Sequence, residues 1–237
     1  MATENYFFLL ILLLAIWISV HKNKLTWAGA VTGGLIGCFV FIGAHFTGIA
    51  MLGLFFLLGT IATSWKINIK EQMGAAEKNK GRRTAGQVIA NGGVAGITGL
   101  LAFLMPVQQV LFQLMMAAAL ASATADTLSS ELGTVYGKKF YNILSFKKDK
   151  RGENGVISIE GTLFGIIGSA IIAVVFATGF GWDQRLGWII AAGITGNIAD
   201  SILGATLERK HYLNNDAVNF INTFLAAMTA SGLMKLF

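Results

Sequence analysis

The sequence predicts an all-α, polytopic integral membrane protein with about eight transmembrane helices. The mean hydropathy is +0.65. Only 13% of the 237 residues are charged, about half the share found in a soluble domain. Apolar runs near the length that crosses a bilayer recur along the chain. We expect a single transmembrane domain, residues 1–237, with cytoplasmic loops at 65–85 and 134–157.

The apolar runs place the helices in order along the chain. They lie at residues 5–21, 26–44, 47–64, 86–105, 108–130, 158–180, 186–207 and 214–235. The first run is short enough to be a secretory signal, but it is preceded by Glu4 and by no Lys or Arg, and no small-residue cleavage site follows it. We therefore expect a retained first span. Segment 65–80 has scattered charges and is expected to lie as an amphipathic helix on the membrane surface.

Basic residues predict the orientation of the helices. Except for Arg185 and Lys235, all 18 Lys and Arg residues follow the first, third, fifth or seventh span, on loops that must share one membrane face. The positive-inside rule makes this face cytoplasmic and puts both termini outside. In a bacterial cell the membrane would be the inner, or plasma, membrane. Because topology explains the positive charge, no nucleic-acid partner is expected.

A weak internal repeat is also visible. Three residues of the second span recur in the sixth, and two residues of the fourth recur in the eighth at nearly the same spacing. The matches are Thr26, Gly29 and Gly33 with Ser158, Gly161 and Gly165, and Gln87 and Asn91 with Asn215 and Asn219. Spans two to four and six to eight are therefore candidate parallel copies. The glycine faces of spans two and six are expected to serve helix packing.

The strongest functional signal is the run from Ala121 to Gly133. Asp126 and Glu131 stand where an apolar span should leave the lipid, and a carboxylate at that depth marks a functional site. On a helix, Asp126 shares one face with Ser129 and Ser130. Hard oxygen ligands of this kind suit Mg²⁺.

Other polar groups fall at the same depth. Asp200 and Ser201 lie in the seventh span, and asparagines line the start of the eighth. All of them belong to the inner half of the membrane or its cytoplasmic surface, whereas a transporter or channel would distribute polar groups along its path or at the midplane. This one-sided distribution favours an enzyme that acts on a lipid head group with a cytosolic co-substrate. Motifs for P-loop, zinc and thiol chemistry do not occur.

Five motifs carry a family resemblance. In order, they are GRRTAGQVIANGG, ATADTLSSELG, GENGVISIEGT, GNIADSILGATLE and NNDAVNF. The set resembles the domain-of-unknown-function 92 family of integral membrane proteins, also called the transmembrane protein 19 family, which includes the phytyl-phosphate kinase of tocopherol synthesis. ADTLSSELGTVYGKK and SIEGTLFG are more distantly similar to the CTP-dependent kinases of dolichol and phytol. The resemblance implies phosphoryl transfer to an isoprenoid lipid.

Together these observations predict a Mg²⁺-dependent kinase that converts an isoprenoid monophosphate to the diphosphate with a nucleoside triphosphate, CTP or ATP. The expected catalytic residues are Asp126, Asp200 and Glu131, and these three with Glu160 are the expected Mg²⁺ ligands. The expected phosphate ligands are Lys80, Arg82, Arg83, Gln87, Asn91, Ser129, Ser130, Asn154, Ser158, Thr162, Ser201, Asn215 and Asn219.

Two alternatives remain open at this stage. One is a CTP-dependent prenol or lipid kinase, or a cytidylyltransferase, that uses the same acidic site. The other is a carrier of a polyprenyl phosphate or an anion. The sequence also leaves a homo-oligomeric state open.

Overall fold

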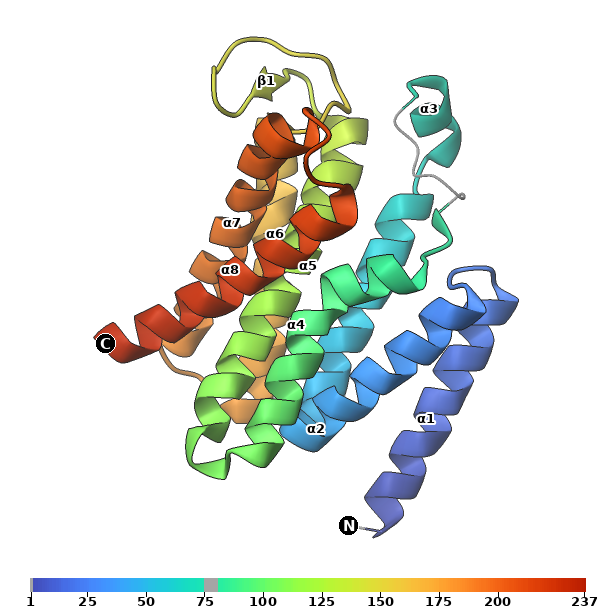
Figure 1. Cartoon of the computed structure of the whole chain (residues 1–237), viewed down its shortest axis with the longest axis vertical. Helices are drawn as coiled ribbons and strands as arrows, with labels where there is room; N and C mark the ends of the chain where they lie inside the picture. The colour runs from blue at the N-terminus through green and yellow to red at the C-terminus, as the bar shows by residue number, and fades with distance from the viewer. Residues whose placement is uncertain (1, 75–80) are drawn as a thin grey trace.

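The computed structural model describes residues 2–74 and 81–237, and these residues form a helical bundle (Figure 1). The long helices are α1 (Ala2–His21), α2 (Trp27–Ser64), α4 (Ala85–Leu104), α5 (Gln109–Tyr136), α6 (Ile159–Phe180), α7 (Arg185–Leu203) and α8 (Asn215–Leu236). Shorter elements are α3 (Ile67–Gln72), the 3₁₀ turn η2 (Pro106–Gln108), the π-helical turn η3 (Gly204–Glu208) and the antiparallel pair β1 (Tyr141–Asn142) and β2 (Val156–Ile157).

The membrane-spanning prediction is confirmed. Seven helices of the described chain are long and apolar enough to cross a bilayer. The two predicted spans at 26–44 and 47–64 are the two legs of α2, which has a backbone break at His45 with φ 48° and ψ −145°. In Figure 1 the chain descends along the first leg of α2 and rises along the second, so that the two legs form a V. Gly48 lies next to the break, where an added Cβ would stand 2.8 Å from side-chain carbons of Val40 and Ala44.

Helix α5 is the central element of the bundle. It packs against α2, α4, α6, α7 and α8, and residues 116–125 in its middle are all buried. Helix α5 extends to Tyr136, six residues beyond the predicted end at 130. Asp126 and Glu131 therefore lie inside a helix rather than at its exit, and the helix backbone fixes the directions of both side chains.

Glycines allow α5 and α6 to approach each other closely. A Cβ on Gly161 would stand 2.8 Å from the Ser129 carbonyl oxygen, and a Cβ on Gly165 would stand 3.2 Å from the Ala125 carbonyl oxygen. Backbone atoms cannot move aside as the end of a flexible side chain can, so a Cβ at either position would push the two helices apart. The glycine face of the sixth predicted span thus serves helix packing, as expected.

The basic loops lie together at one end of the molecule, the upper end of Figure 1. Thr26 N–H donates to the Arg83 carbonyl oxygen over 3.0 Å, and Trp65 Nε1 donates to the Tyr136 hydroxyl over 2.8 Å. Arg209 Nε donates to the Asn154 carbonyl oxygen over 2.6 Å. Loops that follow alternate spans therefore meet on one face. Of segment 65–80, residues 67–72 form the short helix α3, and residues 75–80 lie outside the described chain.

The internal repeat predicts that α2 begins like α6 and that α4 begins like α8. Thr26 and Ser158 cap α2 and α6 alike, since each hydroxyl accepts from a glycine N–H three residues on, at 3.0 and 3.1 Å. Thr84 and Asn214 cap α4 and α8, so the amides matched by sequence do not hold equal positions after their caps. The repeat stays a prediction.

Gly133→Ala tests the close approach of α5 and α6. A Cβ at residue 133 would stand 2.8 Å from Gly161 Cα, so the helices must separate, and we expect a loss of about 1–3 kcal/mol in unfolding free energy. The control is Gly232→Ala in α8, where nothing lies within 4 Å of the added carbon; it should leave stability unchanged or slightly raised. Thermal unfolding in detergent measures both, and equal melting temperatures would contradict the packing.

Candidate active site

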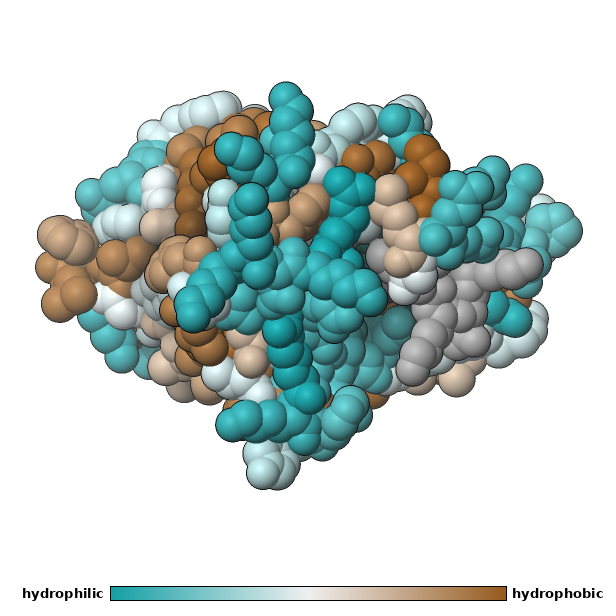
Figure 2. Space-filling model, turned by 90° about the horizontal axis from the view of Figure 1, so that it is seen from above, coloured by the Kyte–Doolittle hydropathy of each residue, from teal (hydrophilic) through white to brown (hydrophobic). Residues whose placement is uncertain are grey.

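A polar cavity opens at the end of the bundle that carries the basic loops. Its volume is about 770 Å³, within the usual range for small-molecule sites. The walls come from the starts of α4 and α8, the C-terminal halves of α5 and α7, and segment 152–158. Ser130, Asn154 and Asn215 of the lining are exposed, so the cavity reaches solvent. Figure 2, which looks onto this end, shows hydrophilic side chains gathered over the middle of the face.

Three helices begin at the cavity. Thr84, Ser158 and Asn214 are the N-caps of α4, α6 and α8, and all three line the cavity. Helix N-termini carry partial positive charge and favour bound anions. The starts of these three helices therefore contribute partial positive charge to the cavity.

Asp126 of α5 and Asp200 of α7 face each other in the cavity, with their carboxyl groups within hydrogen-bond reach. Asp200 Oδ2 also accepts from Asn222 Nδ2 over 2.7 Å. Within residues 2–74 and 81–237, no ion pair joins either carboxyl group to a basic side chain. Two such groups side by side in a bundle need a shared proton or a cation between them.

Charge in the cavity wall is mostly negative. The carboxylates are Asp126, Glu131, Glu153, Asp200, Glu208 and Asp216, while Arg83 is the basic residue of the described lining. The Arg83 guanidinium also lies 5.3 Å from the ring centroid of Phe55, on the second leg of α2. The described chain holds no ready-made group of three His, Cys, Asp or Glu ligands for a metal, so a cation would take Asp126 and Asp200 together with amide, hydroxyl or substrate oxygens.

Glu131 differs from the two aspartates because it has a basic partner. The Lys70 ammonium of α3 binds the Glu131 carboxylate and also donates to the Ala62 and Thr63 carbonyl oxygens at 2.7 and 3.2 Å. Lys70 is fully buried and Glu131 is 9% exposed. The pair thus joins the end of α2 to α5 behind the cavity wall, and a negative charge committed to Lys70 is less available to a metal.

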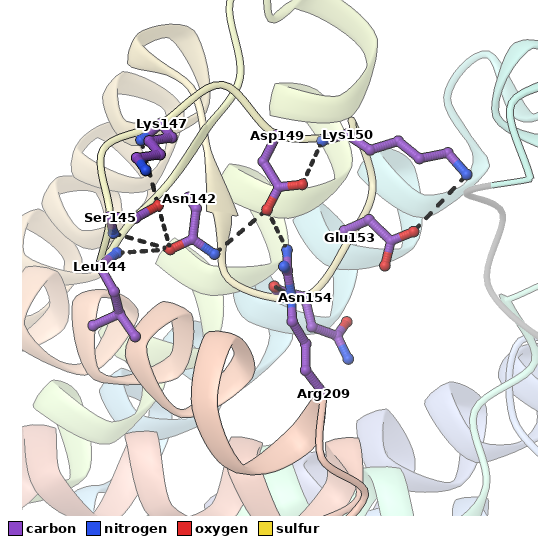
Figure 3. Close-up of polar contacts among 9 residues, drawn as sticks. All are labelled: Asn142, Leu144, Ser145, Lys147, Asp149, Lys150, Glu153, Asn154 and Arg209. Carbon is purple, nitrogen blue, oxygen red and sulfur yellow. Dashed lines mark hydrogen bonds and ion pairs between the residues drawn. The ribbon is translucent and has the colours of Figure 1, made fainter.

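The outer wall of the cavity is a loop fastened to the end of α7 (Figure 3). Arg209 Nη2 binds Asp149 Oδ2 over 2.8 Å, while Arg209 Nε binds the Asn154 carbonyl oxygen. Hydrogen bonds from the Lys150 N–H and from Arg209 hold the pKa of Asp149 below its ordinary value, so this ion pair is formed at neutral pH. Gly155, at φ +72°, packs against Ala205 with no room for a side chain.

The structure brings most of the predicted site residues to one cavity. Its lining includes Asp126, Asp200, Glu131, Arg83, Gln87, Asn91, Ser129, Ser130, Asn154, Ser158, Ser201, Asn215 and Asn219. Gln87 Oε1 is used within α4, where it accepts from the Thr84 N–H over 2.9 Å, and Asn91 Nδ2 donates to the Gln87 carbonyl oxygen over 3.0 Å. These two amides therefore offer only part of their hydrogen-bonding capacity to a ligand.

Three predicted residues of the described chain stand apart from this lining. Arg82 Nε donates to the Leu25 carbonyl oxygen over 3.3 Å, Thr162 donates to the Ser158 carbonyl oxygen over 3.0 Å, and Glu160 accepts from the Lys138 N–H over 3.4 Å. Lys80 lies outside the described residues. The expected Mg²⁺ ligand Glu160 is thus held at the loop side of α6.

Several site residues were missing from the prediction. Glu208 lines the cavity near Asn154 and Asn215, which belong to the same lining. Asn197 and Asp216 also belong to the lining. The spacing of Asp200 and Glu208 on one helical face was the available signal for Glu208. Nothing in the sequence pointed to Lys70, because its partner is 61 residues away in the chain.

Comparison with known proteins decides the family. The profile of the integral membrane protein family DUF92 matches residues 10–227. The chain belongs to this family. The DUF92 match includes all five motifs noted in the sequence, and each of them contributes carboxylates or amides to the cavity wall. No solved structure matches the chain significantly.

Similar relatives come from plants, cyanobacteria and archaea. Protein VTE6, chloroplastic, of Arabidopsis thaliana is 33% identical over 86% of this chain and 63% of its own length, so the chain spans just under two thirds of that relative. An uncharacterized membrane protein of Synechocystis sp. is 32% identical over 93% of this chain and 87% of its own length. An uncharacterized membrane protein of Methanocaldococcus jannaschii is 31% identical over 84% of this chain and 82% of its own length.

Lys70→Met and Glu131→Gln test the buried ion pair. Each single change leaves an unbalanced buried partner, and we expect a loss of about 3–5 kcal/mol in unfolding free energy. The double variant Lys70→Met/Glu131→Gln removes both charges and should recover a large part of that loss. Thermal unfolding of the four proteins completes the double-mutant cycle. Single variants as stable as the parent would refute the coupling.

Asp149→Asn and Arg209→Gln test the fastening of the cavity wall. Loss of a partly exposed ion pair costs about 1 kcal/mol at most, so the loop should open about two to five times more often. Trypsin cleavage after Lys147 or Lys148, followed by mass spectrometry, measures the opening. Asp183→Asn, in a loop of the opposite end, is the control. The double variant should be cleaved no faster than either single variant, and additive effects would argue against the pair.

Proposed function

We propose that this protein is a membrane lipid kinase that transfers the γ-phosphoryl group of a nucleoside triphosphate to an isoprenoid monophosphate of the phytyl or geranylgeranyl type. The acidic cavity at the basic end of the bundle carries this proposal. The positive-inside rule puts that end in the cytoplasm, with both termini outside. A soluble nucleotide then meets a lipid phosphate where both can reach the cavity.

The charge balance of the cavity supports a divalent cation, for which we propose Mg²⁺. A wall of carboxylates repels two anionic substrates unless cations bridge them, and Asp126 and Asp200 have no basic partner among the described residues. Hard oxygen donors are the ligands that Mg²⁺ prefers. When bound, the ion would neutralise phosphate charge that develops during transfer.

The chemistry requires little from the protein beyond placement of the substrates. An oxygen of the lipid phosphate forms a bond to the γ-phosphorus while the bond from that phosphorus to the β–γ bridging oxygen breaks, which releases the nucleoside diphosphate. A phosphate monoester is already ionised at neutral pH, so no strong general base is needed. Arg83 and the starts of α4, α6 and α8 offer positive charge to the phosphates.

Family membership supports the lipid class. The family includes the phytyl-phosphate kinase noted with the motifs, and the acidic and amide residues of those motifs line the cavity. The surrounding helices present apolar faces to the membrane, and side chains such as Leu57, Ile61 and Leu163 are about half exposed. An isoprenoid tail in that apolar environment would leave its phosphate at the level of the cavity.

The decisive assay uses purified protein in detergent with Mg²⁺, phytyl or geranylgeranyl monophosphate, and each γ-³²P-labelled nucleoside triphosphate in turn. We expect a labelled lipid diphosphate that falls about 100-fold to 1,000-fold in Asp126→Asn and in Asp200→Asn. The control is Asp183→Asn, at the opposite end of the bundle, which should keep parental activity. Thin-layer separation identifies the product.

Each negative outcome of the assay has a distinct meaning. Release of pyrophosphate with α-labelled CTP, and no lipid diphosphate, would replace the kinase by a cytidylyltransferase. Unchanged turnover in both aspartate variants would refute the assigned site. Lipid-phosphate flux into vesicles without nucleotide turnover would replace the enzyme by a carrier.

A further inference from the structure

A buried hydrogen-bond ladder runs along α8 toward the two aspartates of the cavity. Asn222, which is fully buried, donates through Nδ2 to Asp200 Oδ2 over 2.7 Å. Its Oδ1 accepts from the hydroxyl of Ser122, also fully buried, on α5 over 3.0 Å. The contact links three helices, because Asp200 belongs to α7.

The ladder continues outward through the other asparagines of α8. Asn222 Nδ2 lies 3.5 Å from Asn219 Oδ1, and Asn219 Nδ2 donates to Asn215 Oδ1 over 3.2 Å. The Asn215 side chain lies near the Glu208 carboxylate in the cavity wall. Asn222 and Asn219 therefore each accept from the direction of Ser122 and donate toward the cavity, and Asn222 also donates to the Asp200 carboxylate.

The Asp200 carboxylate sets this direction, because it accepts hydrogen bonds whereas the Ser122 hydroxyl can either donate or accept. With Asn222 Nδ2 directed at Asp200, Asn222 Oδ1 is left to accept from the Ser122 hydroxyl. A reversed amide would place Oδ1 against the Asp200 carboxylate, so that two acceptors would face each other without a proton between them. The orientation is therefore decided by the hydrogen bonds that the neighbours can make.

Close packing keeps the ladder in place. Gly196 of α7 lies against the Ser122 hydroxyl, and a Cβ there would stand 2.8 Å from the Asn222 carbonyl oxygen. The three helices are therefore in close contact where Gly196, Ser122 and Asn222 meet. Asn222 Nδ2 holds Asp200 on one side, while Asp200 faces Asp126 on the other.

We propose that Ser122 and Asn222 are positioning residues that fix the Asp200 carboxylate against Asp126 and thereby set the affinity of the aspartate pair for a divalent cation. This inference rests on the cation site of the proposed function. It assigns Asn222 a role beyond helix packing. It also gives a direction to the hydrogen bonds that join Asn222, Asn219 and Asn215 along α8. Residues that hold metal ligands in place typically change metal affinity 10-fold to 100-fold when they are removed.

The test measures direct binding of Mn²⁺, as a spectroscopic stand-in for Mg²⁺, by electron paramagnetic resonance on the purified full chain. We expect Ser122→Ala and Asn222→Leu to raise the Kd for Mn²⁺ by about 10-fold to 100-fold. The matched control is Ser169→Ala on α6, which also removes a buried hydroxyl facing α5 and should stay within about twofold of the parent. Melting temperatures are recorded for all variants.

The outcomes separate this inference from the kinase assignment. Parental Kd values in Ser122→Ala and Asn222→Leu, with lowered melting temperatures, would overturn the positioning role and leave the ladder as a packing device. No Mn²⁺ binding by the parent would also overturn it. The expected Kd changes without any lipid diphosphate formation would support the ladder while the kinase proposal failed. If Asn222→Leu does not fold, Ser122→Ala, which retains the Asn222 side chain, carries the test.

Discussion

Two carboxyl groups that face each other inside a membrane protein impose the main constraint on this structure. Asp126 and Asp200 lie within hydrogen-bond reach of each other, on helices α5 and α7, which pack against each other. Burial of like charges without a compensating partner is unfavourable. The site therefore calls for a cation, a proton or both, and the described residues supply hydrogen-bond donors rather than basic partners.

The rest of the architecture serves this pair. Glycines on α6 allow this helix to lie directly against α5. This contact fixes the position of Asp126 along the length of the bundle. The Lys70–Glu131 pair neutralises a third carboxylate and joins the end of α2 to α5. The Arg209 contacts hold the loop that forms the outer wall of the cavity, and three helix starts direct partial positive charge into it. Together these contacts form an acidic cavity whose wall also contains Arg83 and the starts of three helices.

Much of the fold and of the site could be predicted from the sequence, because the length of apolar segments and the charge of the loops determine how a chain inserts into a membrane. Apolar length predicted the spans, and loop charge predicted which loops meet. The depth of Asp126 and Asp200 predicted that they belong to one site. Three features depended on tertiary contacts and could not be predicted. Helix α5 continues past residue 130 because α6 packs along it, and Lys70 folds back into the bundle from a segment expected on the membrane surface. The orientation of the Asn222 amide is set by hydrogen bonds to Asp200 and Ser122 on two other helices.

The most direct test of the central claim is a crystal structure with Mn²⁺ and a non-hydrolysable nucleoside triphosphate, with anomalous data collected at the manganese edge. The account predicts an anomalous peak in contact with carboxylate oxygens of both Asp126 and Asp200, and with the triphosphate of the nucleotide beside it. A nucleotide bound elsewhere, or a cavity in which the two aspartates share only a proton while the metal lies at another site, would contradict it.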